Sequence, residues 1–170
     1  MATITKASVA DAPALDKLVN SAYRGESSRQ GWTTEADLLS GTRTDVNAII
    51  QLIGHPDTIV LKYEEDGELL GCVELRNENG KLYLGMLSVK PHLQGKGIGK
   101  QLLKAAEAEA AISKCTSIFM TVISVRKELI DWYVRHGYSD TGQRKPFAFN
   151  DPSFGVVKQP LEFVVLEKPL

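Results

Sequence analysis

Hydrophobic positions repeat with two different periods along this chain, and the change of period separates predicted strands from predicted helices. Three β-prone runs, at 58–63, 69–76 and 81–89, are joined by turn sequences rich in Asp, Asn and Gly. This arrangement predicts an antiparallel meander. A helical period then covers 97–112, and a further strand follows at 117–122. Because a helix joins that strand to the meander, it is expected to run parallel to the last meander strand.

Weaker patterns flank this central part. They predict, in chain order, a strand at 3–7, a helix over 15–23, a helix-capping sequence at 34–37, a helix over 44–54 that starts at Thr44, a helix over 126–136, a strand from Tyr138, a loop-rich segment at 141–160 and a strand at 161–166. The expected fold class is α/β (α+β), with a mixed, mostly antiparallel sheet of six to seven strands flanked by helices. One domain over residues 1–170 accommodates all of these elements.

The composition is that of a globular protein, because 43% of the 170 residues are hydrophobic and 24% are charged. A net charge of -1 disfavours nucleic-acid binding, which usually needs a basic excess. We find no signal peptide before the first strand and no apolar run near the ~20 residues of a membrane span. We therefore expect a cytoplasmic protein that binds neither nucleic acid nor membranes.

Cysteine and histidine residues are too few and too scattered to suggest a disulfide or a metal site. Cys72 and Cys115 each lie in or beside an apolar segment, so both are expected to be buried free thiols. His55, His92 and His136 show no metal-ligand spacing. The sequence therefore predicts no metal cofactor.

The most informative stretch connects the strand at 81–89 to the helix that follows it. Gly95, Gly97 and Gly99 cluster there, although glycine is unfavourable inside a helix. At a helix start, glycines allow a ligand to approach backbone N–H groups that have no partner within the helix. Such N–H groups bind phosphate well, so the turn is a candidate anion site.

The distribution of charge supports an anion site at this turn. Residues 79–106 contain five lysines and no acidic residue, although the whole chain is nearly neutral. Lys96 and Lys100 are expected at the rim of the site. The alternative interpretation is a tight loop with a solvated lysine face, since glycine and lysine content alone is weak evidence.

The motif itself is more specific than its composition. Gln94-x-x-Gly97-x-Gly99, which follows a strand and a link containing Pro91, resembles the Q/R-x-x-G-x-G/A signature of the GNAT acetyltransferases. It is not a dinucleotide-binding fingerprint, because the third spaced glycine is missing, and no Gly-Lys-Ser/Thr of a Walker loop ends it. The order of elements also resembles the GNAT-like acyl-CoA N-acyltransferase fold along nearly the full length.

The resemblance implies which residues hold acetyl-CoA as co-substrate. Backbone N–H groups of the turn would bind its pyrophosphate. A bulged strand that splays from its neighbour would offer free backbone groups to the pantetheine arm and polarise the thioester carbonyl. The implied cofactor-binding residues are Met86, Leu87 and Val89 of that strand, Gln94, Gly95, Lys96, Gly97, Ile98, Gly99 and Lys100 of the turn and helix, and Arg126.

Tyr133 is the catalytic acid that the resemblance implies. It opens residues 133–138, which are similar to the family's Y-x-x-x-G-F, and its phenol would protonate the departing thiolate. Without the resemblance, a core aromatic residue on an amphipathic helix would be the favoured interpretation. The family often has asparagine seven residues earlier, whereas this chain has Arg126. Either Arg126 or nearby Ser124 replaces that pantetheine contact, or the contact is missing.

Glu74 is the candidate general base, because it is the one carboxylate in the apolar run 70–75. Strand alternation places Glu74 and Cys72 on one face and Val73 and Leu75 on the other. Partial burial would raise the pKa of Glu74 toward a useful range. The alternatives are a solvent-facing edge residue and removal of the amine proton through a chain of waters.

The acceptor site is expected in two polar segments, 24–35 and 141–160, because loops on a rigid scaffold often carry specificity. The substrate-binding candidates, which would hold a small charged amine, are Glu26, Arg29, Trp32 and Glu35. The alternative for the first segment is a solvated loop pinned by Trp32.

The leading functional prediction is an acetyl-CoA-dependent N-acetyltransferase that acts on a primary amine of a small molecule by direct attack. A homodimer is a common assembly in the family that the sequence resembles. Three alternatives stay open: acetylation of a protein N-terminus or lysine, a module that senses acetyl-CoA without turnover, and a protein that binds another nucleotide such as NAD.

Overall fold

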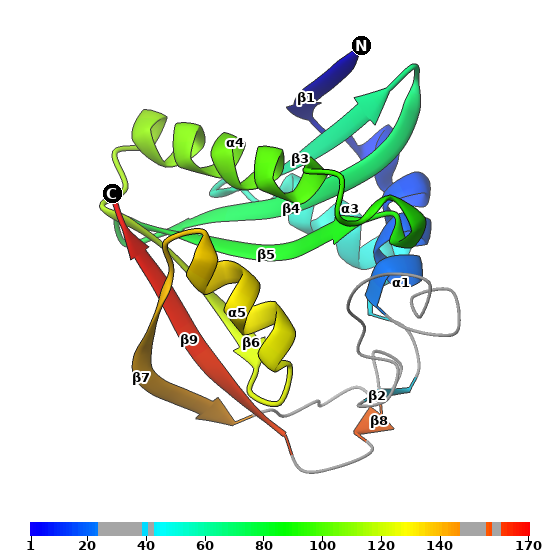
Figure 1. Ribbon diagram of the computed structural model, residues 1–170. Helices are drawn as coiled ribbons and strands as arrows, with labels where there is room; N and C mark the ends of the chain where they lie inside the picture. Colours follow the sequence, from blue (N-terminus) through cyan, green and yellow to red (C-terminus); the bar gives the residue numbers. More distant parts are fainter. Residues whose placement is uncertain (24–38, 41–42, 147–155, 158–160) are drawn as a thin grey trace.

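A mixed seven-stranded sheet organises the part of the chain that the structure, a computed structural model, describes: residues 1–23, 39–40, 43–146, 156–157 and 161–170. The strand order is β1-β3-β4-β5-β6-β9-β7 (Figure 1). These strands are β1 (Ala2–Lys6), β3 (Thr58–Glu65), β4 (Glu68–Glu78), β5 (Lys81–Val89), β6 (Ser117–Ile123), β7 (Ser139–Pro146) and β9 (Glu162–Pro169). A separate two-stranded sheet pairs β2 (Leu39–Ser40) with β8 (Val156–Val157).

Helices cover both faces of the large sheet. They are η1 (Val9–Asp11), α1 (Ala12–Tyr23), α3 (Val46–Gly54), η2 (Pro91–Leu93), α4 (Ile98–Ile112) and α5 (Lys127–Arg135). The α1 and α3 helices lie on one face, and α4 and α5 lie on the other (Figure 1). None of the described helices is both long and apolar enough to cross a membrane.

The predicted meander is confirmed, since β3, β4 and β5 pair antiparallel in sequence order. Both of its turns are two-residue loops, Asp66-Gly67 and Asn79-Gly80, and all four residues have a positive φ. This backbone matches the right-handed twist of the strands that it joins. The parallel pairing of β5 with β6 is also confirmed.

Strand alternation divides the core between the two faces as the sequence predicts. Val73 and Leu75 of β4 pack under α4, in a cluster with Leu102. Cys72 packs on the opposite side with Leu15 of α1 and Ile49 of α3. Cys72 is a free thiol, as is Cys115, and both are buried.

A β-bulge interrupts β5 where the sheet opens. Met86 and Leu87 lie opposite the single residue Val73 of β4, because Glu74 pairs with Gly85 and Cys72 pairs with Ser88. Met86 has a φ of 55°, which is rare for a side chain of its size. The extra residue bends the strand and increases its local twist.

β5 also separates from β6, and the separation begins before the bulge. The two strands pair only through Leu82 with Ile118 and Tyr83 with Phe119, near their first residues. Figure 1 shows them diverging from there like the arms of a V. Backbone groups on the second half of β5 therefore have no ladder partner in β6.

Two local expectations need correction. Asp45, and not Thr44, caps α3, because its side chain accepts a 2.7 Å hydrogen bond from the N–H of Ala48. Residues 141–146 are strand and not loop, because β7 pairs with β9 as far as Pro146. The predicted cap at 34–37 lies outside the described residues.

The contact between α4 and β4 at Gly71 leads to a test of stability. A Cβ added at Gly71 would lie 3.0 Å from the carbonyl oxygen of Ser88 and 3.1 Å from side-chain carbons of Ile98 and Leu102. We expect Gly71→Ala to lower the free energy of unfolding by about 1–3 kcal/mol, because the helix and a strand backbone must both shift. Urea unfolding measures this change.

Gly54→Ala is the matched control, because nothing lies within 4 Å of the added carbon there. It should leave the unfolding midpoint unchanged or raise it slightly. Equal midpoints for the two variants would show that α4 does not approach β4 as closely as described.

Candidate active site

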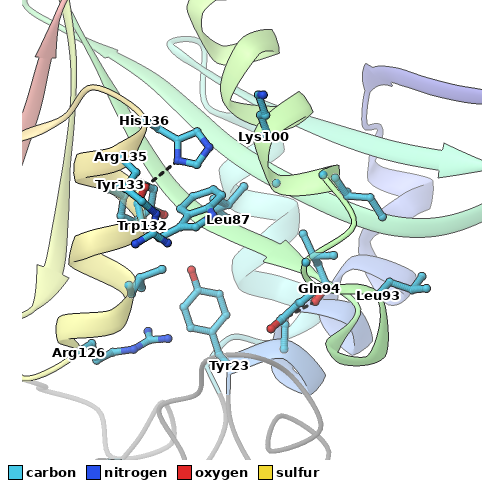
Figure 2. A pocket seen from close by; sticks show the side chains of 17 residues that line it. Tyr23, Leu87, Leu93, Gln94, Lys100, Arg126, Trp132, Tyr133, Arg135 and His136 are labelled. Carbon is cyan, nitrogen blue, oxygen red and sulfur yellow. Dashed lines mark hydrogen bonds between the residues drawn. The ribbon is translucent and has the colours of Figure 1, made fainter.

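An apolar-walled cleft of about 350 Å³ opens beside the second half of β5, which no longer pairs with β6. The end of α1, the glycine turn before α4, and one side of α5 enclose it (Figure 2). The cleft is lined by Ala22, Tyr23, Leu87, Val89, Leu93, Gln94, Gly95, Gly97, Ile98, Gly99, Lys100, Arg126, Leu129, Trp132, Tyr133, Arg135 and His136.

The glycine turn is held in one conformation by its own sequence. Gly95 and Gly97 have φ values of 86° and 87°, which residues with a Cβ rarely adopt. The side chain of Gln94 donates a 3.1 Å hydrogen bond to the carbonyl of Val89, which folds the turn back onto β5. The N–H of Gln101 donates to the carbonyl of Gly97, and this is the first hydrogen bond of α4. The N–H groups that come before Gln101 in α4 have no acceptor within the helix.

Gly99 is required by a close approach between α4 and α5. A Cβ at Gly99 would lie 3.2 Å from the indole of Trp132, so the indole packs directly over the start of α4. Trp132 also stacks on His136, with ring centroids 4.4 Å apart. Nδ1 of His136 donates to the carbonyl of Trp132 at 2.7 Å, since a carbonyl oxygen can only accept.

The charges around the cleft favour an anionic ligand. Lys100, Arg126 and Arg135 line it, and none of the lining residues that the structure describes is acidic. Lys96 belongs to the same turn but is exposed and does not line the cleft. The positive charge therefore adds to the partial positive charge at the N-terminus of α4.

Tyr133 lies in the wall of the cleft and is only 5% exposed. Its ring makes edge contacts with Trp132 and Tyr138 at centroid distances of 5.1 and 5.8 Å. Burial raises the pKa of the Tyr133 phenol well above its ordinary value, and nearby Tyr23 adds to the rise. The phenol is therefore protonated at neutral pH and available as a proton donor.

Tyr23 lies between two guanidinium groups. Arg126, which is 5% exposed and precedes the first residue of α5, lies 5.9 Å from the centre of the Tyr23 ring. Arg43 lies 5.3 Å from the same ring. In Figure 2 the Tyr23 phenol points into the cleft between Arg126 and Gln94. Cation–π contacts of this kind fix the ring between its neighbours.

Glu74 lies in a second cleft, of about 540 Å³, between the sheet and α3. This cleft, named the acceptor-side cleft for the role proposed for it below, is lined by Arg43, Thr44, Ala48, Gln51, Leu52, His55, Thr58, Glu74, Arg76 and Tyr83. Glu74 is 6% exposed. Burial raises the pKa of its carboxyl, while the guanidinium groups of Arg76 and Arg43 act in the opposite direction.

The structure places most of the residues chosen from the sequence in one cleft. The first cleft, named the cofactor cleft for the role proposed for it below, brings together Leu87, Val89, Gln94, Gly95, Gly97, Ile98, Gly99, Lys100, Arg126 and Tyr133. Glu74 lines the other cleft, and the Met86 side chain packs in the core beside α1 and α3. The acceptor candidates Glu26, Arg29, Trp32 and Glu35 lie outside the described residues.

Sequence reasoning missed several residues that line the two clefts. Trp132 and His136 are three and seven residues after Leu129, a spacing that puts all three on one helix face with Tyr133. That periodicity could have marked them. Nothing comparable marks Tyr23 or Arg43, which meet only because the chain folds back on itself.

Comparison with known proteins identifies the family. The sequence pattern of the acetyltransferase (GNAT) family matches residues 15–138, which is most of the chain. A spermine/spermidine N(1)-acetyltransferase of Bacillus subtilis is 32% identical over 68 residues, which make up 39% of this chain and 45% of that protein. The chain therefore belongs to the acetyltransferase (GNAT) family.

Solved structures share the fold at low sequence identity. The ribosomal-protein-S18-alanine N-acetyltransferase of Escherichia coli aligns with a TM-score of 0.74 at 12% identity, over 99% of this chain and 94% of that one. The PaiA N-acetyltransferase of Thermoplasma acidophilum, solved with coenzyme A, aligns with a TM-score of 0.72 at 19% identity, over 100% and 99%. These structures confirm the predicted fold class.

The buried carboxyl of Glu74 leads to a prediction about stability and pH. A carboxyl whose pKa is raised in the folded state stabilises the fold below its unfolded pKa and loses that contribution as pH rises. We expect Glu74→Gln to gain stability relative to the unmodified protein between about pH 4 and about pH 8. Thermal unfolding midpoints across this range measure the effect.

Glu65→Gln is the matched control, because Glu65 is exposed at the end of β3. Its midpoint should follow that of the unmodified protein at every pH. A Glu74→Gln difference that stayed constant or shrank with rising pH would contradict the burial of an ionisable carboxyl.

Proposed function

We propose that this protein is an acetyl-CoA-dependent N-acetyltransferase that transfers an acetyl group to a primary amine of a small molecule by direct attack. The observation that carries the proposal is the phosphate-binding geometry of the turn at 94–99, at the mouth of a cleft that reaches Tyr133. Membership of the acetyltransferase family supports the reaction class.

The cofactor cleft fits the chemistry of acetyl-CoA. Coenzyme A combines phosphate groups with a long, mostly uncharged pantetheine arm that ends in the thioester. The turn and Lys100 offer N–H groups and positive charge to the phosphates. Leu87, Val89 and Leu129 offer an apolar wall to the arm. A CoA complex is known for the structurally similar PaiA N-acetyltransferase, which supports the same assignment.

The splayed backbone of β5 would orient the reacting group. Acetyl-CoA supplies an activated acetyl thioester. The backbone groups near Leu87 have no partner in β6, so they are available to bond the arm and the thioester carbonyl. A strand holds such groups rigidly, which lowers the entropic cost of orienting them during the reaction.

Two side chains would transfer protons during the reaction, one as a donor and one as an acceptor. Tyr133 holds its proton at neutral pH and lies in the wall of the cofactor cleft, so it would protonate the departing thiolate. Glu74 would accept a proton from the amine, directly or through water. It is buried beside the bulge, opposite Gly85, and its raised pKa brings it nearer to neutral pH than an ordinary carboxyl.

Calorimetry with acetyl-CoA tests the assignment of the cofactor. We expect micromolar binding of acetyl-CoA, and weaker binding of NAD and of 3′-dephospho-CoA, because both lack the 3′-phosphate that the positive rim would attract. The titration needs no acceptor. Equal affinity for all three compounds would favour a general nucleotide site. An absence of binding would contradict the assignment of the turn as a phosphate-binding site.

Replacement of Tyr133 separates an enzyme from a module that only binds acetyl-CoA. We expect Tyr133→Phe to lower kcat by about 100-fold, because general acid catalysis contributes that much or more. The affinity for acetyl-CoA should stay unchanged. Thiol release gives kcat, and calorimetry gives the affinity.

Tyr138→Phe is the control for this variant. Tyr138 is also buried, contacts Tyr133, and has a hydroxyl with no hydrogen-bond partner among the described residues. Loss of that hydroxyl should leave kcat within a factor of about two, since no bond is broken. If both variants lost activity equally, packing of the rings and not proton transfer would explain the effect.

A further inference from the structure

The acceptor-side cleft carries positive charge around one buried carboxyl. Of the described residues that line it, Arg43, Arg76 and His55 are basic, and Glu74 is the only acidic one. Two arginines beside one carboxylate suit a ligand that bears an anion as well as an amine.

Arg76 is fixed in place by three neighbours. Its Nε donates to Oε1 of Glu78 at 2.8 Å, and one terminal nitrogen lies 3.8 Å from Oε2 of Glu74. Its guanidinium also lies 4.9 Å from the centre of the Tyr83 ring. An arginine that is held by stacking and by an ion pair loses little further freedom on binding a ligand.

Tyr83 connects this cleft to the bulge. A Cβ on Gly85 would lie 2.7 Å from a Tyr83 ring carbon and 2.9 Å from the Tyr83 hydroxyl, so the hydroxyl end of the ring lies against Gly85. Gly85 pairs with Glu74 and directly precedes Met86. The Tyr83 hydroxyl and the Glu74 carboxyl therefore both lie at the point where β5 bends.

Arg43 connects the acceptor-side cleft to the cofactor cleft. It lines the acceptor-side cleft, and its guanidinium lies 5.3 Å from the ring of Tyr23, which lines the cofactor cleft. The two clefts thus meet at the Tyr23–Arg43 contact, on opposite sides of the bulged strand. A ligand in the acceptor-side cleft would approach the reacting end of the cofactor cleft from the other side.

We propose that the acceptor is a small amine that also carries an oxyanion, held by Arg43 and Arg76 while its nitrogen lies beside Glu74 and Tyr83. This inference rests on the proposed acetyltransferase function and adds the class of acceptor. Carboxylate and phosphate share the recognition chemistry, since both accept paired hydrogen bonds from guanidinium groups. The assignment differs from the polyamine acceptors named for the similar Bacillus subtilis protein.

Matched pairs of amines test the proposal. Each pair differs by one oxyanion: ornithine and putrescine, phenylalanine and phenethylamine, phosphoethanolamine and ethanolamine, with spermidine as an additional polyamine. Thiol release from acetyl-CoA gives kcat/KM for each compound with the full chain. We expect the oxyanion-bearing member to be preferred in at least one pair, and the pair shows whether carboxylate or phosphate is recognised.

Arginine variants show whether the preference comes from this cleft. Arg43→Gln and Arg76→Gln should each lower kcat/KM for the preferred oxyanion-bearing amine by roughly tenfold to a hundredfold, chiefly through KM. The same variants should change kcat/KM for its oxyanion-free partner far less. Lys62→Gln is the control, because Lys62 lies on β3, pairs with Asp11 and Glu64, and lines neither cleft.

A binding measurement keeps this proposal separate from the proposed function. Ligand-observed NMR with the same amines, without any cofactor, reports the cleft directly. Oxyanion-dependent binding that is lost in Arg43→Gln would support this inference even if no thiol were released. Preference for putrescine or spermidine would overturn it and leave the acetyltransferase function standing. Absence of both binding and turnover would overturn both.

Discussion

The β-bulge at Met86 is the constraint on which the rest of the structure depends. A positive φ at a methionine is costly, and neighbouring side chains hold it: the Ser88 hydroxyl donates to the Met86 carbonyl at 3.1 Å, and the Cys72 sulfur lies 3.8 Å from that oxygen. Burial raises the pKa of the Cys72 thiol to about 12, so it keeps its proton and can donate. The bulge lies in the part of β5 that no longer pairs with β6, and it bends the strand between the cofactor cleft and Glu74.

The bulged strand also divides the electrostatics of the molecule. On one side, the first turn of α4 borders the cofactor cleft, and the described lining residues are basic or uncharged, which suits a polyanion. On the other side, Glu74 is the one acidic group among the described lining residues, and it is buried beside the guanidinium groups of Arg43 and Arg76. The two environments lie on opposite faces of the sheet, because alternate side chains of a strand point to opposite faces. Fold and chemistry are therefore linked through strand alternation.

Much of this arrangement could be predicted from local sequence. The hairpin turns, the meander and the glycines of the turn each follow from the backbone that a few adjacent residues allow. The strand at 141–146 could not be predicted, because its polar sequence becomes a strand only by pairing with β9. The contact between Tyr23 and Arg43 could not be predicted either, because it joins the end of α1 to the residues just before α3. Glu74 was found as an isolated charge in an apolar run, but its separation from the cofactor cleft depends on the bulge.

The pairing of β6 with β9 has a consequence for the order in which the molecule folds. The wall that carries the glycine turn follows directly after the meander, whose strands are neighbours in sequence. The α5 wall depends on the pairing of β6 with β9, which are far apart in the chain. Their pairing runs from Ser117 with Pro169 to Ile123 with Phe163. Contacts between distant segments form slowly, because loop closure must be completed before they are gained. Lys168 of β9 then bonds to Glu107 of α4 and to the carbonyl of His136. We therefore expect the cofactor cleft to form late in folding, when the α5 wall docks onto the wall that carries the glycine turn.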